Sequence, residues 1–210
     1  MLLYILSGII IFILCYLYYL GVFRTLNFQE SKLGPLKIFY LEYQGEYHKI
    51  GPTFGRVSRD IAPYFKFAKM FGLYFDNPSN VVDKKQTRAI VGVILNSGEN
   101  PLKEEEFAKA YIQYKKAELP IVDATLTQFP YRNSLTYLLF GKIYREIMNH
   151  ITRKFGKNHA NVNFSAIMEV YYMHPPNMFI EFYWPHGVNA EKYLLSAAPK
   201  PIYKNEPHEE

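Results

Sequence analysis

The first 23 residues are almost continuously hydrophobic and contain no charged side chain, and Arg24 follows at once. At about 1.5 Å rise per residue, a helix of this length covers about 35 Å, enough for a hydrocarbon core roughly 30 Å thick. No Lys or Arg precedes this stretch, and it ends in bulky aromatic residues, which disfavours a cleaved signal peptide. We therefore expect a transmembrane anchor at residues 1–23 and a juxtamembrane linker at residues 24–34.

The charges flanking this stretch predict its orientation. Arg24, Lys32 and Lys37 all follow it, and positive residues stay on the cytoplasmic side of a membrane. The sole cysteine, Cys15, lies within the stretch, so the rest of the chain has no disulfide. These observations predict a single-pass membrane protein whose domain faces the cytosol.

Beyond the linker, the hydrophobic pattern alternates between strand and helix periods. Alternating or β-branched stretches predict strands, and apolar residues at helical spacing predict helices. The predicted strands are 36–44, 71–75, 87–95, 120–129, 165–173 and 177–184; the predicted helices are 52–69, 101–114 and 133–154. Pro63 should interrupt the first of these helices.

The order of these elements is β-α-β-β twice, with an extra helix between the halves. Two such units can place their helices on one face of a common antiparallel sheet and leave a groove at the seam. We therefore predict an α+β fold of two β-α-β-β repeats over residues 35–190, behind an N-terminal transmembrane helix. Residues 191–210 are polar and rich in proline, and we expect a flexible C-terminal tail.

The composition narrows the range of functions. The net charge is +5, but the basic residues are scattered, so nucleic-acid binding is not indicated. The six histidines show no paired metal-ligand spacing, and no glycine-rich phosphate loop or nucleophile signature is present. The sequence thus predicts no cofactor and no enzymatic activity.

Two glutamates on the last predicted strands are the candidate ligand-binding residues. Strand alternation places Glu169 on one face with Tyr171, and Glu181 on one face with Tyr183. A carboxylate in an aromatic groove can bind a hydrophobic cation. Two alternatives remain open: each glutamate lies on a solvated face or pairs with a nearby Lys or Arg, or a glutamate and a tyrosine perform acid–base chemistry in a hydrolase.

Several local sequence motifs resemble known proteins. The strands containing Met168-Glu169-Val170-Tyr171 and Ile180-Glu181-Phe182-Tyr183-Trp184-Pro185 are similar to strands of the GyrI-like small-molecule-binding domain. The segments 72–78, 88–95 and 125–131 resemble the membrane-anchored eukaryotic branch, the testis-expressed, ER-anchored receptor family of selective ER autophagy. This resemblance implies an ER-membrane protein with a cytosolic, non-enzymatic GyrI-like domain that binds a small hydrophobic or cationic ligand or a protein partner. It also implies that Glu181 or Glu169 contacts the ligand.

The same resemblance implies an alternative role as a reticulophagy receptor. Receptors of that family bind a ubiquitin-like autophagy modifier through an aromatic-x-x-aliphatic motif that adds a strand to the modifier. Residues 203–210 contain no such motif, whereas Tyr47-His48-Lys49-Ile50 fits it. Tyr47 and Ile50 are therefore the candidate protein-binding residues.

Overall fold

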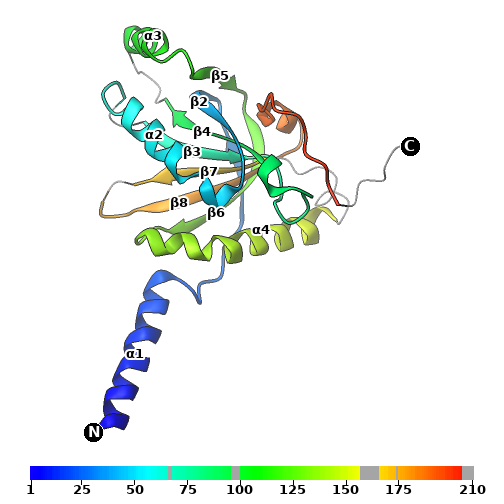
Figure 1. Ribbon diagram of the computed structural model, residues 1–210. Coiled ribbons are helices and arrows are strands. Elements are labelled where there is room, and N and C mark those ends of the chain that lie inside the picture. Colours follow the sequence, from blue (N-terminus) through cyan, green and yellow to red (C-terminus); the bar gives the residue numbers. More distant parts are fainter. Residues whose placement is uncertain (66–67, 96–99, 157–165, 174, 205–210) are drawn as a thin grey trace.

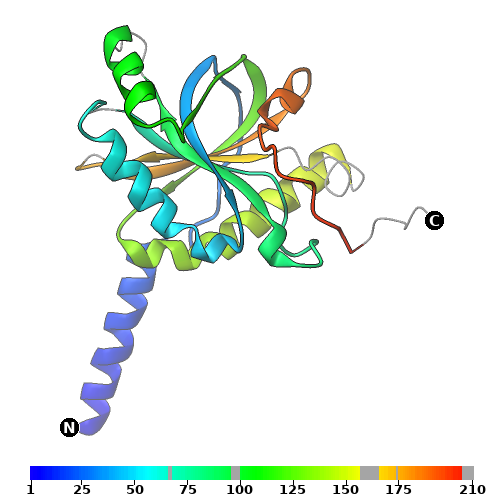
Figure 2. The same ribbon diagram turned by 45° about the horizontal axis from the view of Figure 1, so that its top comes forward.

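The computed structural model describes residues 1–65, 68–95, 100–156, 166–173 and 175–204. Within these residues the strands form one antiparallel sheet of eight strands in the order β1-β6-β8-β7-β3-β4-β2-β5. The sheet curls strongly, so that it resembles half of a barrel (Figures 1 and 2). The strands are β1 (Gln29–Leu33), β2 (Leu36–Gln44), β3 (Lys69–Tyr74), β4 (Arg88–Ile94), β5 (Lys115–Leu119), β6 (Val122–Pro130), β7 (Ile167–Tyr172) and β8 (Phe179–His186).

The α-helices in the described residues are α1 (Leu2–Leu20), α2 (Gly51–Ile61), α3 (Pro101–Ala110) and α4 (Phe140–Phe155). Short 3₁₀ helices occupy η1 (Tyr47–Lys49), η2 (Lys84–Gln86), η3 (Ser134–Leu139) and η4 (Ala190–Tyr193). Helix α2 begins at Gly51-Pro52, where a proline costs no hydrogen bond, and it ends before Pro63, which cannot continue it. Helix α3 is capped by Asn100, whose side chain accepts a hydrogen bond from the Leu102 amide.

The sheet consists of two similar halves that meet at its centre. One half is β2-α2-β3-β4 and the other is β6-α4-β7-β8, and the halves join where β3 pairs with β7. Strand β1 lies just before the first half in the chain but pairs with β6 of the second half. Strand β5 lies just before the second half but pairs with β2 of the first half. The two halves therefore exchange edge strands.

Side chains from the two faces of the sheet form separate cores. On one face, α2 and α3 cover one half of the sheet through Val57, Ile61 and Phe107. Helix α4 covers the other half through Ile143, Ile147 and Ile151. The opposite, concave face holds a third core that includes the fully buried Tyr193 of η4. The seam between the halves therefore lies under the helices.

The prediction of a transmembrane anchor at residues 1–23 is wrong. Across the residues described, the structure contains no helix with both the length and the apolar character that crossing a bilayer requires. Helix α1 ends at Leu20, and the next residue, Gly21, adopts a left-handed conformation with φ 87°, so α1 has 19 residues instead of 23. The predictions of a single-pass ER membrane location and of a membrane partner depended on this anchor and are corrected with it.

The predicted fold class is also wrong in its strand content. The six predicted strands lack β1, which falls in the predicted linker 24–34, and β5, which overlaps nothing predicted as a strand. Both are charged segments, QESKL and KKAEL, in which only one residue is buried. Charged side chains are typical of edge strands, because one edge of such a strand has no neighbour. Residues 66–67 and Ser165, which belong to predicted elements, lie outside the described residues.

The C-terminal segment up to Lys204 lies against the sheet. Tyr193 donates a hydrogen bond from its hydroxyl to the carbonyl of Pro120. Further along, Tyr203 forms a bridge with Val81 and donates to the carboxylate of Asp76. Asp76 is buried and also forms an ion pair with Arg88 (2.8 Å). Tyr193 and Tyr203 thus attach the segment to two separate places on the sheet domain.

Candidate functional site

The candidate site is built around Glu169, at the centre of the sheet. Glu169 lies on β7 directly opposite Gly72 on β3, where the two halves meet, and its side chain is 1% exposed. A Cβ atom on Gly72 would lie 2.9 Å from the ring and hydroxyl of Tyr74 and 3.0 Å from the ring of Phe54. Gly72 therefore leaves the space that these two aromatic side chains occupy beside the carboxylate.

Tyrosine hydroxyls surround the Glu169 carboxylate. Tyr144 of α4 donates to Oε1 over 2.6 Å, and Tyr171 of β7 donates to Oε2. The hydroxyl of Tyr74 on β3 also interacts with the carboxylate. The three tyrosines come from both halves of the fold, so the site exists only after the halves have assembled.

Burial dominates the electrostatics of this site. Burial raises the pKa of Glu169 from 4.5 to about 7, although the hydrogen bonds from Tyr144, Tyr171 and Tyr74 lower it in part. Burial and the nearby carboxylate raise the pKa of each of these tyrosines well above 10. The tyrosines thus remain protonated donors. In the part of the chain that the structure describes, no Lys, Arg or His forms an ion pair with Glu169.

A second layer of aromatic rings surrounds the tyrosines. Phe54 of α2 meets the Tyr171 ring edge-on at 5.3 Å, and Tyr47 meets the Tyr74 ring at 4.9 Å. Burial and the neighbouring Tyr131 raise the pKa of Tyr137 of η3, the Glu169 carboxylate adds a smaller contribution, and Tyr137 is 45% exposed. The site thus extends from the buried carboxylate past aromatic rings to a partly exposed tyrosine. Such a site suits a cation with aromatic substituents.

The second predicted glutamate lies on the other face of the sheet. Glu181 pairs with Val170, the neighbour of Glu169, so strand alternation directs the two glutamate side chains to opposite faces. Glu181 is 7% exposed and accepts hydrogen bonds from Gln128 and Tyr183, both over 2.8 Å. The structure therefore brings Glu169 and Tyr171 together and Glu181 and Tyr183 together, but it does not join the two pairs in one groove.

The candidate modifier-binding segment is folded into the domain. Tyr47 begins the 3₁₀ helix η1, and its hydroxyl donates to the Arg88 carbonyl and accepts from the Asp76 amide. Ile50 is 7% exposed and packs in the core under α2. Neither side chain is available to an added strand, because both are already packed within the domain. The predicted modifier partner is corrected on this ground.

Sequence reasoning missed three residues that complete the Glu169 site. Tyr144 fell within the predicted apolar stripe of the second-half helix, and Tyr74 and Gly72 fell within a strand predicted without a chemical role. A glycine inside an apolar strand signals close approach of other groups, so Gly72 was the detectable signal. The partnership of Tyr144 with Glu169 spans 25 residues and depends on how α4 packs on the sheet.

Comparisons with known proteins give a coarse match of fold. No protein-family model and no curated protein sequence matches the chain. Among solved structures, the C-terminal domain of EcmrR is similar, with a TM-score of 0.47 and 10% identity over 76% of this chain and 96% of that domain. An integron cassette protein from Vibrio cholerae is similar with a TM-score of 0.49 and 10% identity over 77% and 99% of the two chains. Both likenesses are coarse, and neither shows the ER autophagy receptor family.

Proposed function

We propose that the domain binds a lipophilic aromatic cation, with the Glu169 carboxylate as the counter-ion. The observation that carries this proposal is a fully buried carboxylate that lacks a basic partner in the described chain and is enclosed by aromatic rings. A buried carboxylate is stabilised strongly by a cation, and the faces of tyrosine rings attract the same charge. A ligand of this class would supply both interactions at once.

The ligand would reach Glu169 by displacing tyrosine hydroxyls. Both carboxylate oxygens already accept hydrogen bonds from Tyr144 and Tyr171. Phe54 packs edge-on against the Tyr171 ring and is partly buried, and Tyr137 is nearly half exposed. We propose that these two rings pack against the substituents of the ligand.

We propose a binding role in preference to a catalytic one. The hydroxyls around Glu169 have raised pKa values, so they are weak proton donors and weak nucleophiles near neutral pH. Their chemistry suits holding a carboxylate in place. The ligand-binding role also agrees with the GyrI-like sequence motifs around this strand.

A titration with tetraphenylphosphonium tests the proposal. We expect saturable binding to the unmodified protein, measured by calorimetry, and at least tenfold weaker binding to Glu169→Gln, which removes the charge but preserves the shape. Glu181→Gln is the matched control, since it changes a similarly buried glutamate on the opposite face. Equal affinity in Glu169→Gln and the unmodified protein, or a loss confined to Glu181→Gln, would contradict the proposal.

A further inference from the structure

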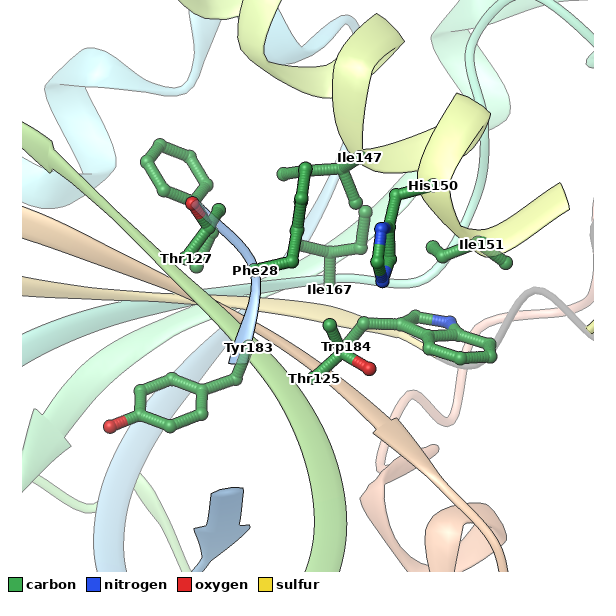
Figure 3. A pocket seen from close by; sticks show the side chains of 10 residues that line it. Phe28, Thr125, Thr127, Ile147, His150, Ile151, Ile167, Tyr183 and Trp184 are labelled. Atoms are coloured by element: carbon green, nitrogen blue, oxygen red, sulfur yellow. The ribbon is translucent and has the colours of Figure 1, made fainter. Parts of the chain in front are cut away.

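Two spaces in the structure differ greatly in size. The space that Figure 3 shows, between Ile147 of α4 and Thr127 of β6, has a volume of about 10 Å³, which is room for about one water molecule. A second space, the open cleft, has a volume of about 210 Å³ and lies between the α1–β1 connection, the end of β6 and the start of β8. An apolar cavity of about 150 Å³ in a protein can hold benzene. The open cleft therefore has room for one aromatic ring with its walls as they stand.

Two arginines of the open cleft have no acidic partner. Arg24 and Arg132 line the cleft, and the described residues around it include no Asp or Glu. Within the parts of the chain that the structure describes, the arginines that form ion pairs are Arg56 and Arg88. The guanidinium charges of Arg24 and Arg132 are therefore left to the solvent, and an anion in the cleft would compensate both.

Contacts with helices position both arginines. The guanidinium group of Arg132 lies over the ring of Tyr19 on α1, 5.2 Å from the ring centre. The backbone of Arg24 is held by Lys142 of α4, which donates a hydrogen bond to its carbonyl over 2.7 Å. Because these contacts already order the two residues, a ligand that meets them loses less free energy to ordering.

One wall of the open cleft is apolar. Met178 and Phe179 form this wall where β8 begins. The Tyr131 amide donates to the Met178 carbonyl over 3.0 Å, which holds the start of β8 to the end of β6. The Phe179 ring stacks on the ring of Tyr172, with 4.4 Å between the ring centres. The wall thus offers an ordered apolar surface beside the two positive charges.

We propose that the open cleft binds a small aromatic carboxylate. The carboxylate accepts hydrogen bonds from the guanidinium groups of Arg24 and Arg132, whose planar array of N–H donors matches the two carboxylate oxygens. The aromatic ring packs on Met178 and Phe179, which an inorganic anion could not use. Charge and apolar surface together therefore select a ligand that carries both.

The carboxylate of Glu181 restricts the charge of the ligand further. Gln128 lines the open cleft, and its side-chain amide donates to the Glu181 carboxylate over 2.8 Å. A second negative charge on the ligand near Gln128 would be repelled by this carboxylate. The cleft therefore favours a monocarboxylate over a dicarboxylate.

An NMR titration with benzoate tests the proposal. The side-chain amides of Gln128 and Asn177 line the cleft, so their resonances report on binding at this place. We expect saturable shifts with benzoate in the unmodified protein. Benzamide has nearly the same shape without the charge, and inorganic phosphate has the charge without the ring. Each of these two compounds should bind roughly tenfold more weakly than benzoate, or more weakly still.

Substitutions of the arginines test the two contacts separately. Arg24→Gln and Arg132→Gln should each weaken benzoate binding about tenfold, as expected when a hydrogen bond to a charged group is lost. Arg132→Lys should recover only part of this affinity, because an ammonium group cannot form the paired hydrogen bonds of a guanidinium group. Arg59→Gln is the matched control, since it removes an exposed arginine of α2, which covers the other half of the sheet.

Four results would overturn the proposal. The first is the absence of saturable shifts with benzoate in the unmodified protein, and the second is unchanged benzoate affinity in Arg24→Gln and Arg132→Gln. The third is an equal loss of affinity in Arg59→Gln, which would indicate a general effect of net charge. The fourth is binding of benzamide or phosphate as tight as that of benzoate. Glu169→Gln should bind benzoate as the unmodified protein does, so this proposal can fail independently of the cation site.

Discussion

The raised pKa of Glu169 predicts an unusual loss of stability as the pH rises. The pKa of this carboxyl group is about 7 in the folded protein, against 4.5 for the ordinary group. The folded protein therefore binds a proton that the unfolded chain has already released between these two values. The contribution of this protonated carboxyl group to the unfolding free energy is complete below pH 4.5, and it is lost as the pH rises through about 7.

The size of this effect follows from the two pKa values. The difference between the two pKa values corresponds to about 3 kcal/mol of unfolding free energy, and most of it falls between pH 5 and pH 8. Glu169→Gln replaces the titrating group with a neutral one of nearly the same shape. Relative to this variant, the unmodified protein should therefore lose roughly 2 to 3 kcal/mol over that range.

Urea unfolding of both proteins from pH 5 to pH 8 measures the difference directly. Other titrating groups change stability over the same range; burial lowers the pKa of His150 and His186, for example, so their contribution to stability increases as the pH rises. These contributions are common to both proteins and cancel in the difference. Parallel stability curves for the two proteins would show that the carboxylate does not titrate near neutrality and would refute the reasoning.

Two further predictions concern the frame of the fold. A Cβ atom on Gly92 would lie 2.1 Å from a backbone carbonyl oxygen of β2, so Gly92→Ala should unfold at a markedly lower temperature than the unmodified protein. Gly55 is at an open position of helix α2, so Gly55→Ala should unfold at the same temperature as the unmodified protein or at a higher one. Asp76→Asn removes the buried negative charge that pairs with Arg88 and should cost about 3 kcal/mol in urea unfolding. Glu46→Gln, at a pair whose lysine is mostly exposed, should cost much less. Similar melting temperatures within the glycine pair, or equal costs within the acidic pair, would contradict these expectations.

The regular strands and helices were predictable because their signals are local. The continuous apolar stretch within residues 87–95 reflects a strand that is buried on both faces, and the apolar stripe of α4 reflects a helix with a single buried face. The edge strands β1 and β5 were not predictable in this way. Their side chains are mostly exposed and charged, so hydrogen bonds to distant strands, and not burial, hold them in the sheet.

The candidate site was predictable only in part for the same reason. The placement of Glu169 with Tyr171 on one face is a local property of a strand. The contact with Tyr144, the space above Gly72 and the separation of Glu181 onto the other face all depend on register and packing between distant segments.

The sequence by itself determined that this chain would alternate strands and helices in two similar units, and that a glutamate would lie among aromatic residues on an apolar strand. Only the tertiary structure decided that the two units join at Gly72 and Glu169 and that they exchange edge strands. The physical reason is that the spacing of apolar and polar residues is a local property, which determines whether one segment forms a strand or a helix. Pairing register, burial of a charge and the raised pKa of Glu169 arise only when segments far apart in the sequence exclude water from the same place.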